Sequence, residues 1–140
     1  MSGPAAILRG GCRCGAVGYE VADAFAYALN CHCSQCRRAT GAACKPFAGI
    51  ATPALRLTAG ADSLLIYGET GDSQPHDVLC ARCGSLLWSV VREGAFVHVT
   101  LGTLIDAPTI RPSAHIFTGS KAPWHRITDD LPQFEGFPTG

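Results

Sequence analysis

The stretch GCRCG at residues 11–15 and the stretch CARCGS at residues 80–85 each hold two cysteines a few positions apart. The first pair, Cys12 and Cys14, has C-x-C spacing and leads into a predicted strand. Residues i and i+2 of a strand point to the same face, so we expect both sulfur atoms to reach one metal ion. The two stretches are far apart in sequence, but distant strands become neighbours in a small β domain.

The second pair, Cys80 and Cys83, has the C-x-x-C spacing of a turn that closes around a metal ion. Gly84 follows and can adopt the positive φ angle that such turns often need. Together the two pairs predict a tetrahedral four-thiolate site with Zn–S distances of about 2.3 Å. Four thiolates favour zinc, although they can also hold iron, and a closed set of this kind stabilises a fold instead of catalysing a reaction.

A third group of thiols lies in CHCSQC, where Cys31, Cys33 and Cys36 repeat both spacings within one segment. Three protein ligands and an open position are typical of a catalytic zinc. The candidates for the fourth ligand are Cys44, a histidine, a carboxylate or a small molecule. The alternative is a single metal site, with the other thiols spare.

Two arginines, Arg37 and Arg38, follow these thiols directly. They are either solvated surface charges or guanidinium groups that offset thiolate charge and hold a substrate carboxylate. A thiol substrate that carries carboxylates would suit both the arginines and a zinc ion with an open position. Strand alternation points His32 away from the neighbouring cysteines, and His98 alternates with valines as a partly buried sheet histidine would.

The composition limits the class of protein. The 140 residues correspond to one domain, with 47% hydrophobic and 16% charged residues. Lys plus Arg and Asp plus Glu both number 11, so no net charge favours nucleic acid or an anionic membrane. The sequence shows neither the basic start and apolar run of a targeting signal nor the apolar stretch of about 18 residues that a membrane span needs. We therefore expect a cytoplasmic chain with reduced thiols. The alternative for the eight cysteines, a disulfide framework, would need a secretory signal.

The hydrophobic pattern predicts an all-β fold. Val17, Tyr19 and Val21 alternate with smaller or polar residues, as in a half-buried strand. VVREGAFVHV at residues 90–99 predicts a hairpin with Glu93 and Gly94 in its turn. The best helix candidate is a turn or two around RRATG. The proline-rich residues 121–140 are expected to be irregular, and either to pack over the sheets or to fray at the end. Further strand candidates are AYALN, LRLT, SLLIY, LLWSVV and AFVHVTL.

The segments GGCRCGAVGYEV, CHCSQCRRATGA, CARCGSLLW and HIFTGSKAPWHRI, in that order, resemble the glutathione-dependent formaldehyde-activating enzyme family, whose domain is shared with centromere protein V. The resemblance runs from about Gly10 to Phe134 and implies one domain over residues 1–140. It implies layered antiparallel sheets of the β-tent kind found in Mss-type proteins. It also implies two zinc ions per chain: a structural zinc on Cys12, Cys14, Cys80 and Cys83, and a second zinc on Cys31, Cys33 and Cys36 that glutathione engages or displaces.

The named reaction of this family joins formaldehyde to glutathione as S-hydroxymethylglutathione, a carbon–sulfur lyase reaction in reverse. The resemblance therefore implies a lyase-type enzyme with a small thiol partner; the competing hypothesis is a non-catalytic binding or interaction module with two zinc ions. Two positions depart from the family pattern. Cys44 stands where members often have an aromatic residue, and PHDVLC before the second C-x-x-C lacks a basic residue and Phe that many members carry.

Overall fold

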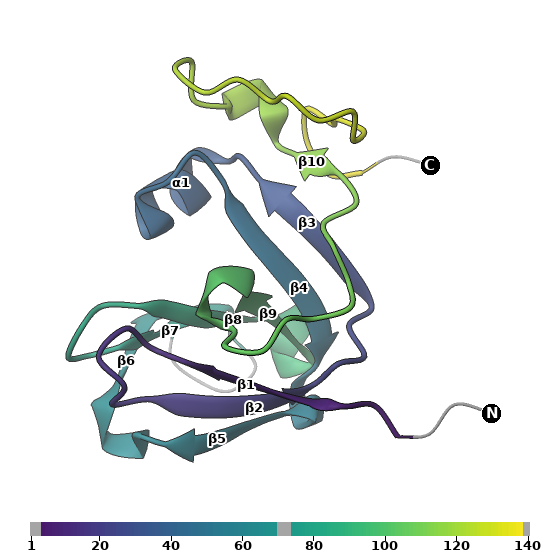
Figure 1. The fold of residues 1–140 in the computed structure, drawn as a ribbon. Helices are drawn as coiled ribbons and strands as arrows, with labels where there is room; N and C mark the ends of the chain where they lie inside the picture. Colours follow the sequence, from purple (N-terminus) through teal and green to yellow (C-terminus); the bar gives the residue numbers. More distant parts are fainter. Residues whose placement is uncertain (1–3, 70–73, 139–140) are drawn as a thin grey trace.

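The computed structural model describes residues 4–69 and 74–138, which form two layered β-sheets (Figure 1). The smaller sheet has the antiparallel order β1-β2-β5, and the larger has the order β10-β3-β4-β9-β8-β7-β6. The predicted all-β fold of layered antiparallel sheets, of the β-tent kind, is confirmed, although the short strand β10 joins β3 in parallel. The strands are β1 (Ile7–Gly11), β2 (Gly18–Ala22), β3 (Tyr27–Cys31), β4 (Lys45–Ala51), β5 (Leu55–Ala59), β6 (Leu64–Gly68), β7 (His76–Cys80), β8 (Leu86–Val91), β9 (Phe96–Thr100) and β10 (His115–Ile116).

The main core lies between the smaller sheet and one face of the larger sheet. The predicted alternation in β2 is confirmed, because Tyr19 and Val21 are buried while Gly18, Glu20 and Ala22 are partly exposed. Burying each such side chain stabilises the fold by about 1.5–3 kcal/mol. The larger sheet contributes the alternate residues of its central strands: Ile50, Val78, Trp88, Val90, Val97 and Val99.

The predicted hairpin is formed by β8 and β9, and its turn is longer than expected. Val91 pairs with Phe96, so the loop runs over residues 92–95, and its residues Arg92, Glu93 and Gly94 all have positive φ angles. Arg92 and Glu93 have φ angles of 53° and 58°, a left-handed conformation that non-glycine residues seldom adopt. The turn places the Arg92 guanidinium over the rings of Tyr27 and Phe96.

The helix α1 (Ser34–Thr40) begins three residues earlier than the predicted helical segment. Its N-cap is Cys33, whose Sγ accepts a hydrogen bond from the backbone N–H of Cys36 at 3.2 Å. Gly41 ends the helix with a left-handed φ of 65°. The sequence prediction missed this start because a thiol is not among the preferred N-cap side chains.

Residues 121–138 form no helix or strand, as predicted for the proline-rich segment. They lie beside β10 at the end of β3 and β4 that also carries α1 (Figure 1). His115 in β10 donates its N–H to Pro132 and accepts from the N–H of Phe134, both at 2.9 Å. We call residues 121–138 the C-terminal segment.

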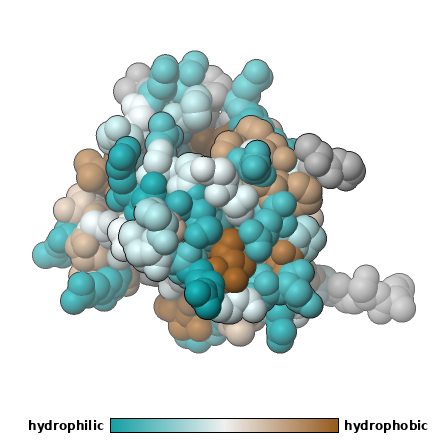
Figure 2. Space-filling view, turned by 90° about the horizontal axis from the view of Figure 1, so that it is seen from above, coloured by the Kyte–Doolittle hydropathy of each residue, from teal (hydrophilic) through white to brown (hydrophobic). Residues whose placement is uncertain are grey.

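The exposed surface is mixed in character. On the face seen in Figure 2, hydrophobic residues form separate patches between hydrophilic ones. Among residues 4–69 and 74–138, no helix has the length and apolar character to cross a membrane.

Candidate metal centres and active site

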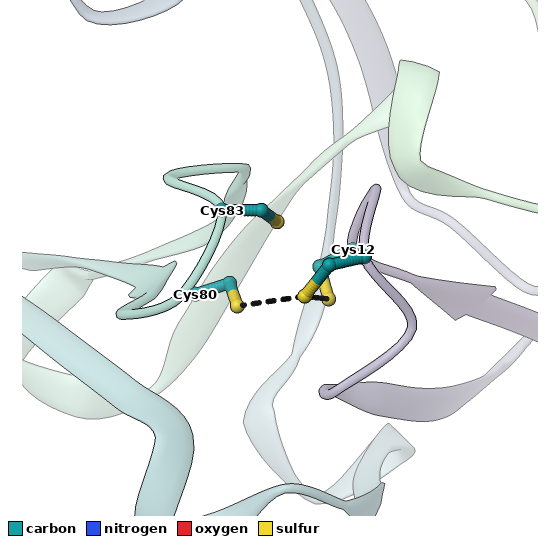
Figure 3. A group of neighbouring side chains, drawn as sticks. Cys12, Cys80 and Cys83 are labelled. Atoms are coloured by element: carbon teal, nitrogen blue, oxygen red, sulfur yellow. Dashed lines mark hydrogen bonds between the residues drawn. The ribbon is translucent and has the colours of Figure 1, made fainter.

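Four cysteines from two segments that are distant in sequence come together at the edge of the core. Cys12 and Cys14 lie in the turn between β1 and β2, Cys80 is the last residue of β7, and Cys83 lies in the turn that follows β7. Figure 3 labels Cys12, Cys80 and Cys83 and shows their side chains pointing toward one another. The four Sγ atoms all lie within 4.8 Å of one another, with 3.7 Å from Cys12 to Cys14 and 3.8 Å from Cys14 to Cys80. Tetrahedral zinc with Zn–S bonds of about 2.3 Å requires sulfur–sulfur distances of about 3.8 Å. The arrangement therefore fits a zinc ion.

The geometry of the first pair differs from the prediction, because Cys12 and Cys14 lie in a turn and not on a strand. The turn is closed by the N–H of Cys12, which donates to the carbonyl of Val17 at 3.0 Å. In return the N–H of Val17 donates to the Sγ of Cys12 at 3.2 Å. Gly84 has a φ of 80°, as the spacing of the second pair predicted.

Ser85 connects the two turns of this site, a role that the sequence pattern did not reveal. Its Oγ accepts a hydrogen bond from the backbone N–H of Arg13 at 3.0 Å and lies 3.3 Å from the Sγ of Cys83. The hydrogen bond from the Ser85 hydroxyl lowers the pKa of the Cys83 thiol to about 5. Because metal ligands must be deprotonated, this hydrogen bond favours the form of Cys83 that could bind a metal ion at neutral pH.

A second cluster consists of Cys31 at the end of β3, Cys33 at the start of α1, and Cys36 within α1. Their Sγ atoms also lie within 4.8 Å of one another. A hydrogen bond from the Cys36 thiol lowers the pKa of Cys31 to about 6, and the same contact raises the pKa of Cys36 well above its usual range. Three thiols of this kind fit a zinc ion with one coordination position left for another ligand. All eight cysteines lie in the described residues and have free thiols.

The structure brings Cys44 near the second cluster but not into it. Its Sγ is not among the sulfur atoms that lie within 4.8 Å of one another. Burial raises the pKa of the Cys44 thiol, and the nearby Cys31 and Asp129 add to this shift.

The two predicted arginines differ in their surroundings. Arg37 is half-buried, and its Nε atom is buried without a hydrogen-bond partner in the described part of the chain. Arg38 is exposed and lines a pocket of about 490 Å³ with Gln35 and Ala39 of α1 and with Asp77 and Leu79 of β7. Neither arginine forms an ion pair within residues 4–69 and 74–138.

Sequence reasoning missed a cation that lies beside the second cluster. Lys45 in β4 is paired with Cys31 across the sheet and is only 6% exposed. Its Nζ donates to the Oγ of Ser89 at 3.0 Å, and Ser89 donates to a carboxylate oxygen of Asp77 at 2.6 Å. The positive charge of Lys45 contributes to the lowered pKa of Cys31. A single lysine in a strand has no sequence signal, since its position beside Cys31 depends on strand register.

Comparisons with known proteins identify the family. The family model for the glutathione-dependent formaldehyde-activating enzyme matches residues 7–120. The chain belongs to this family. A Halomonas elongata protein that carries the provisional name glutathione-dependent formaldehyde-activating enzyme is 30% identical over 138 residues, covering 86% of this chain and 81% of the relative. The crystal structure of a Rhodobacter sphaeroides protein superposes with a TM-score of 0.59 at 31% identity, covering 73% of this chain and 92% of the other.

In this member of the family, His32 links the second cluster to the C-terminal segment. Its side chain is completely buried, and its Nε2 lies 2.8 Å from the Nδ1 of His115. The Nε2 of His115 lies 3.0 Å from both carboxylate oxygens of Asp129. Burial lowers the pKa of His32 to about 4, so its ring is neutral at pH 7. The His32–His115–Asp129 chain thus holds the loop of Cys31 and Cys33 against the C-terminal segment.

Proposed function

We propose that this chain is a zinc-dependent enzyme that joins a thiol bearing carboxylates, such as glutathione, to a small aldehyde. The reverse reaction is a carbon–sulfur lyase reaction. The observation that carries this proposal is the difference between the two clusters, because one has four thiols and the other has three. The name carried by the Halomonas elongata relative supports the same chemistry.

The two clusters serve different purposes in this proposal. The four-thiol cluster holds a structural zinc that joins the β1–β2 turn to the turn after β7. The three-thiol cluster holds a second zinc, giving two zinc ions per chain. Zinc bound there would supply a Lewis acid that favours the thiolate form of a thiol at neutral pH.

The side chains around the three-thiol cluster bind and orient the substrate. Arg38 is exposed in the pocket beside α1 and is suited to hold a carboxylate of the thiol. Half-buried Arg37 directly follows Cys36, and its guanidinium offsets thiolate charge. Lys45 provides a fixed positive charge next to Cys31 and offsets the negative charge of the thiolates. Its hydrogen bond to Ser89 restricts the ammonium group to the sheet face that carries Cys31.

The reaction itself balances without an oxidant or reductant. The sulfur of the thiol forms a bond to the aldehyde carbon while the π bond of the carbonyl breaks, and the carbonyl oxygen takes the proton that the thiol gives up. The product is an S-hydroxyalkyl thiol. In reverse, the carbon–sulfur bond breaks, the hydroxyl loses its proton, and the free thiol and aldehyde form again.

Cobalt substitution tests the two sites separately. Cobalt replaces zinc in tetrahedral thiolate sites and reports its ligands through visible absorption bands. We expect two cobalt ions per chain, and we expect glutathione to change the bands of one site only. The matched variant Cys36→Ser should remove the responsive bands and keep the others.

Cys44 provides the decisive control. If wild type does not respond to glutathione but Cys44→Ala does, Cys44 is the fourth ligand of the second metal. The second site would then be closed, and the chain would be a non-catalytic module with two zinc ions.

A further inference from the structure

A pocket of about 720 Å³ lies between the outer face of the larger sheet and the C-terminal segment. The sheet contributes Tyr27 and Leu29 from β3, Phe47 from β4 and His98 from β9. Ile116 in β10 and Phe134 in the C-terminal segment form part of the opposite wall. The volume is within the range of about 300–1,000 Å³ that is typical of sites for small molecules.

The pocket is directly adjacent to the second cysteine cluster. Cys31, Phe47 and Ile116 form one buried hydrophobic cluster, and Cys33 and Cys36 pack against it. Phe47 and Ile116 therefore contact the cysteine cluster and also line the pocket. Strand pairing explains this arrangement, because Leu29 and Cys31 point to the same face of β3 and Phe47 lies opposite Leu29 in β4.

Polar groups lie at a few positions in this apolar pocket. The hydroxyl of Tyr27 is 2.6 Å from the Nε2 of His98. Burial lowers the pKa of His98 to about 4, so the imidazole is neutral at pH 7. At the β8–β9 turn, the Arg92 guanidinium lies 5.4 Å from the ring centroid of Tyr27 and 4.6 Å from that of Phe96. A pocket with apolar walls and few polar groups is suited to a ligand with an apolar body.

The two substrates of the proposed reaction differ in how well they match this pocket. Glutathione is charged and polar, and the candidate carboxylate ligand Arg38 lies on α1, outside the pocket. Formaldehyde has two non-hydrogen atoms and would leave most of the volume empty. An aldehyde with a larger apolar group would bury apolar surface there, with a gain of about 25 cal/mol for each Å² removed from water.

We propose that the pocket binds the apolar body of an aldehyde larger than formaldehyde, with an aromatic or branched side chain, and directs its carbonyl toward the Cys31–Cys36 cluster. This inference rests on the proposed function and names the substrate class of the same site. The bond changes are those of thiol addition to an aldehyde, with the apolar group as the substituent on the aldehyde carbon.

Binding is tested first, with benzyl alcohol as a probe that has the aromatic group but cannot react. Ligand-observed NMR on the zinc-loaded full chain measures its dissociation constant. Ser113 is exposed at the pocket, so Ser113→Trp should fill the space and weaken binding at least tenfold. Thr58→Trp, on the exposed side of β5 outside the pocket, is the matched control and should bind as wild type does. Val91→Phe fills the pocket from the sheet side and serves as the test if Ser113→Trp does not fold.

Kinetics with glutathione then separate this inference from the proposed function. We expect phenylacetaldehyde to have a higher kcat/KM than formaldehyde. Ser113→Trp should lower the kcat/KM for phenylacetaldehyde at least tenfold and change that for formaldehyde less than twofold. The inference is overturned if benzyl alcohol does not bind, if Ser113→Trp binds it normally, or if formaldehyde reacts and phenylacetaldehyde does not. If neither aldehyde reacts although benzyl alcohol binds in the pocket, the proposed function is wrong and the assignment of an aldehyde fails with it.

Discussion

The two cysteine clusters should differ sharply in their contribution to folding. We expect Cys80→Ser to prevent folding, whereas Cys36→Ser should leave a folded protein. Cys80 is the last residue of β7, is completely buried, and belongs to the cluster that joins β7 to the β1–β2 turn. Cys36 belongs to α1, a helix of seven residues, none of which is buried.

The expected magnitude follows from this difference. A structural zinc contributes about 10–16 kcal/mol of apparent binding free energy, which is also folding free energy when the site forms only in the folded state. Domains of this size are stable by about 5–15 kcal/mol in total. Losing one of four ligands should therefore remove a free energy comparable to the total free energy of unfolding of the domain. Loss of Cys36 should disorder only the segment around α1 and leave the rest of the fold intact.

Circular dichroism, urea unfolding and metal content measure the outcome. Cys80→Ser should show no cooperative urea transition, and Cys36→Ser should keep one metal ion per chain and a cooperative transition. Cys44→Ser is the matched control, because Cys44 is a half-buried cysteine that belongs to neither cluster. If Cys36→Ser unfolds to the same extent as Cys80→Ser, or if Cys80→Ser unfolds at the wild-type midpoint, the division into a structural and an open site is wrong.

Three further predictions follow from single contacts. A Cβ at Gly49 would collide with the Tyr27 ring, so Gly49→Ala should lower the free energy of unfolding by about 1–3 kcal/mol. Gly102→Ala is the control, because a Cβ there has no neighbour within 4 Å, and equal urea midpoints for the two variants would contradict the prediction. Ser85→Ala removes the hydroxyl that lowers the pKa of Cys83, so a chelator competition should show about tenfold weaker zinc binding, with Ser120→Ala as the unaffected serine control. Burial lowers the pKa of His98 from 6.5 to about 4, so the unfolded chain binds the extra proton between these values. The free energy of unfolding should therefore fall by roughly 3 kcal/mol from this residue as pH drops from about 6.5 to about 4, and His98→Gln should lose stability less steeply over that range; parallel pH profiles would refute it.

The sequence alone predicted the cysteine clusters and several strands of this protein, because these features depend on local patterns. The spacing of the cysteines predicted one cluster of four thiols and another of three. The structure brings the four, Cys12, Cys14, Cys80 and Cys83, together as one group. Alternation identified β2, and the apolar runs on either side of Glu93 and Gly94 identified the β8–β9 hairpin. These features depend on residues close together in sequence, or on cysteines whose spacing is itself the signal.

Strand order and register, which only the tertiary structure shows, determine the remaining features of the fold and of the candidate site. The strand β4 was not predicted, because Pro46 and Gly49 interrupt its pattern and it is buried on both faces. Only the pairing of β3 with β4 places Lys45 opposite Cys31, and only the parallel pairing of β10 with β3 brings His115 to His32. The apolar pocket also forms between segments that are distant in the chain. Side-chain periodicity tells which face of a strand is buried, but it carries no information about which strand lies beside it, and that choice is made by the packing of the whole fold.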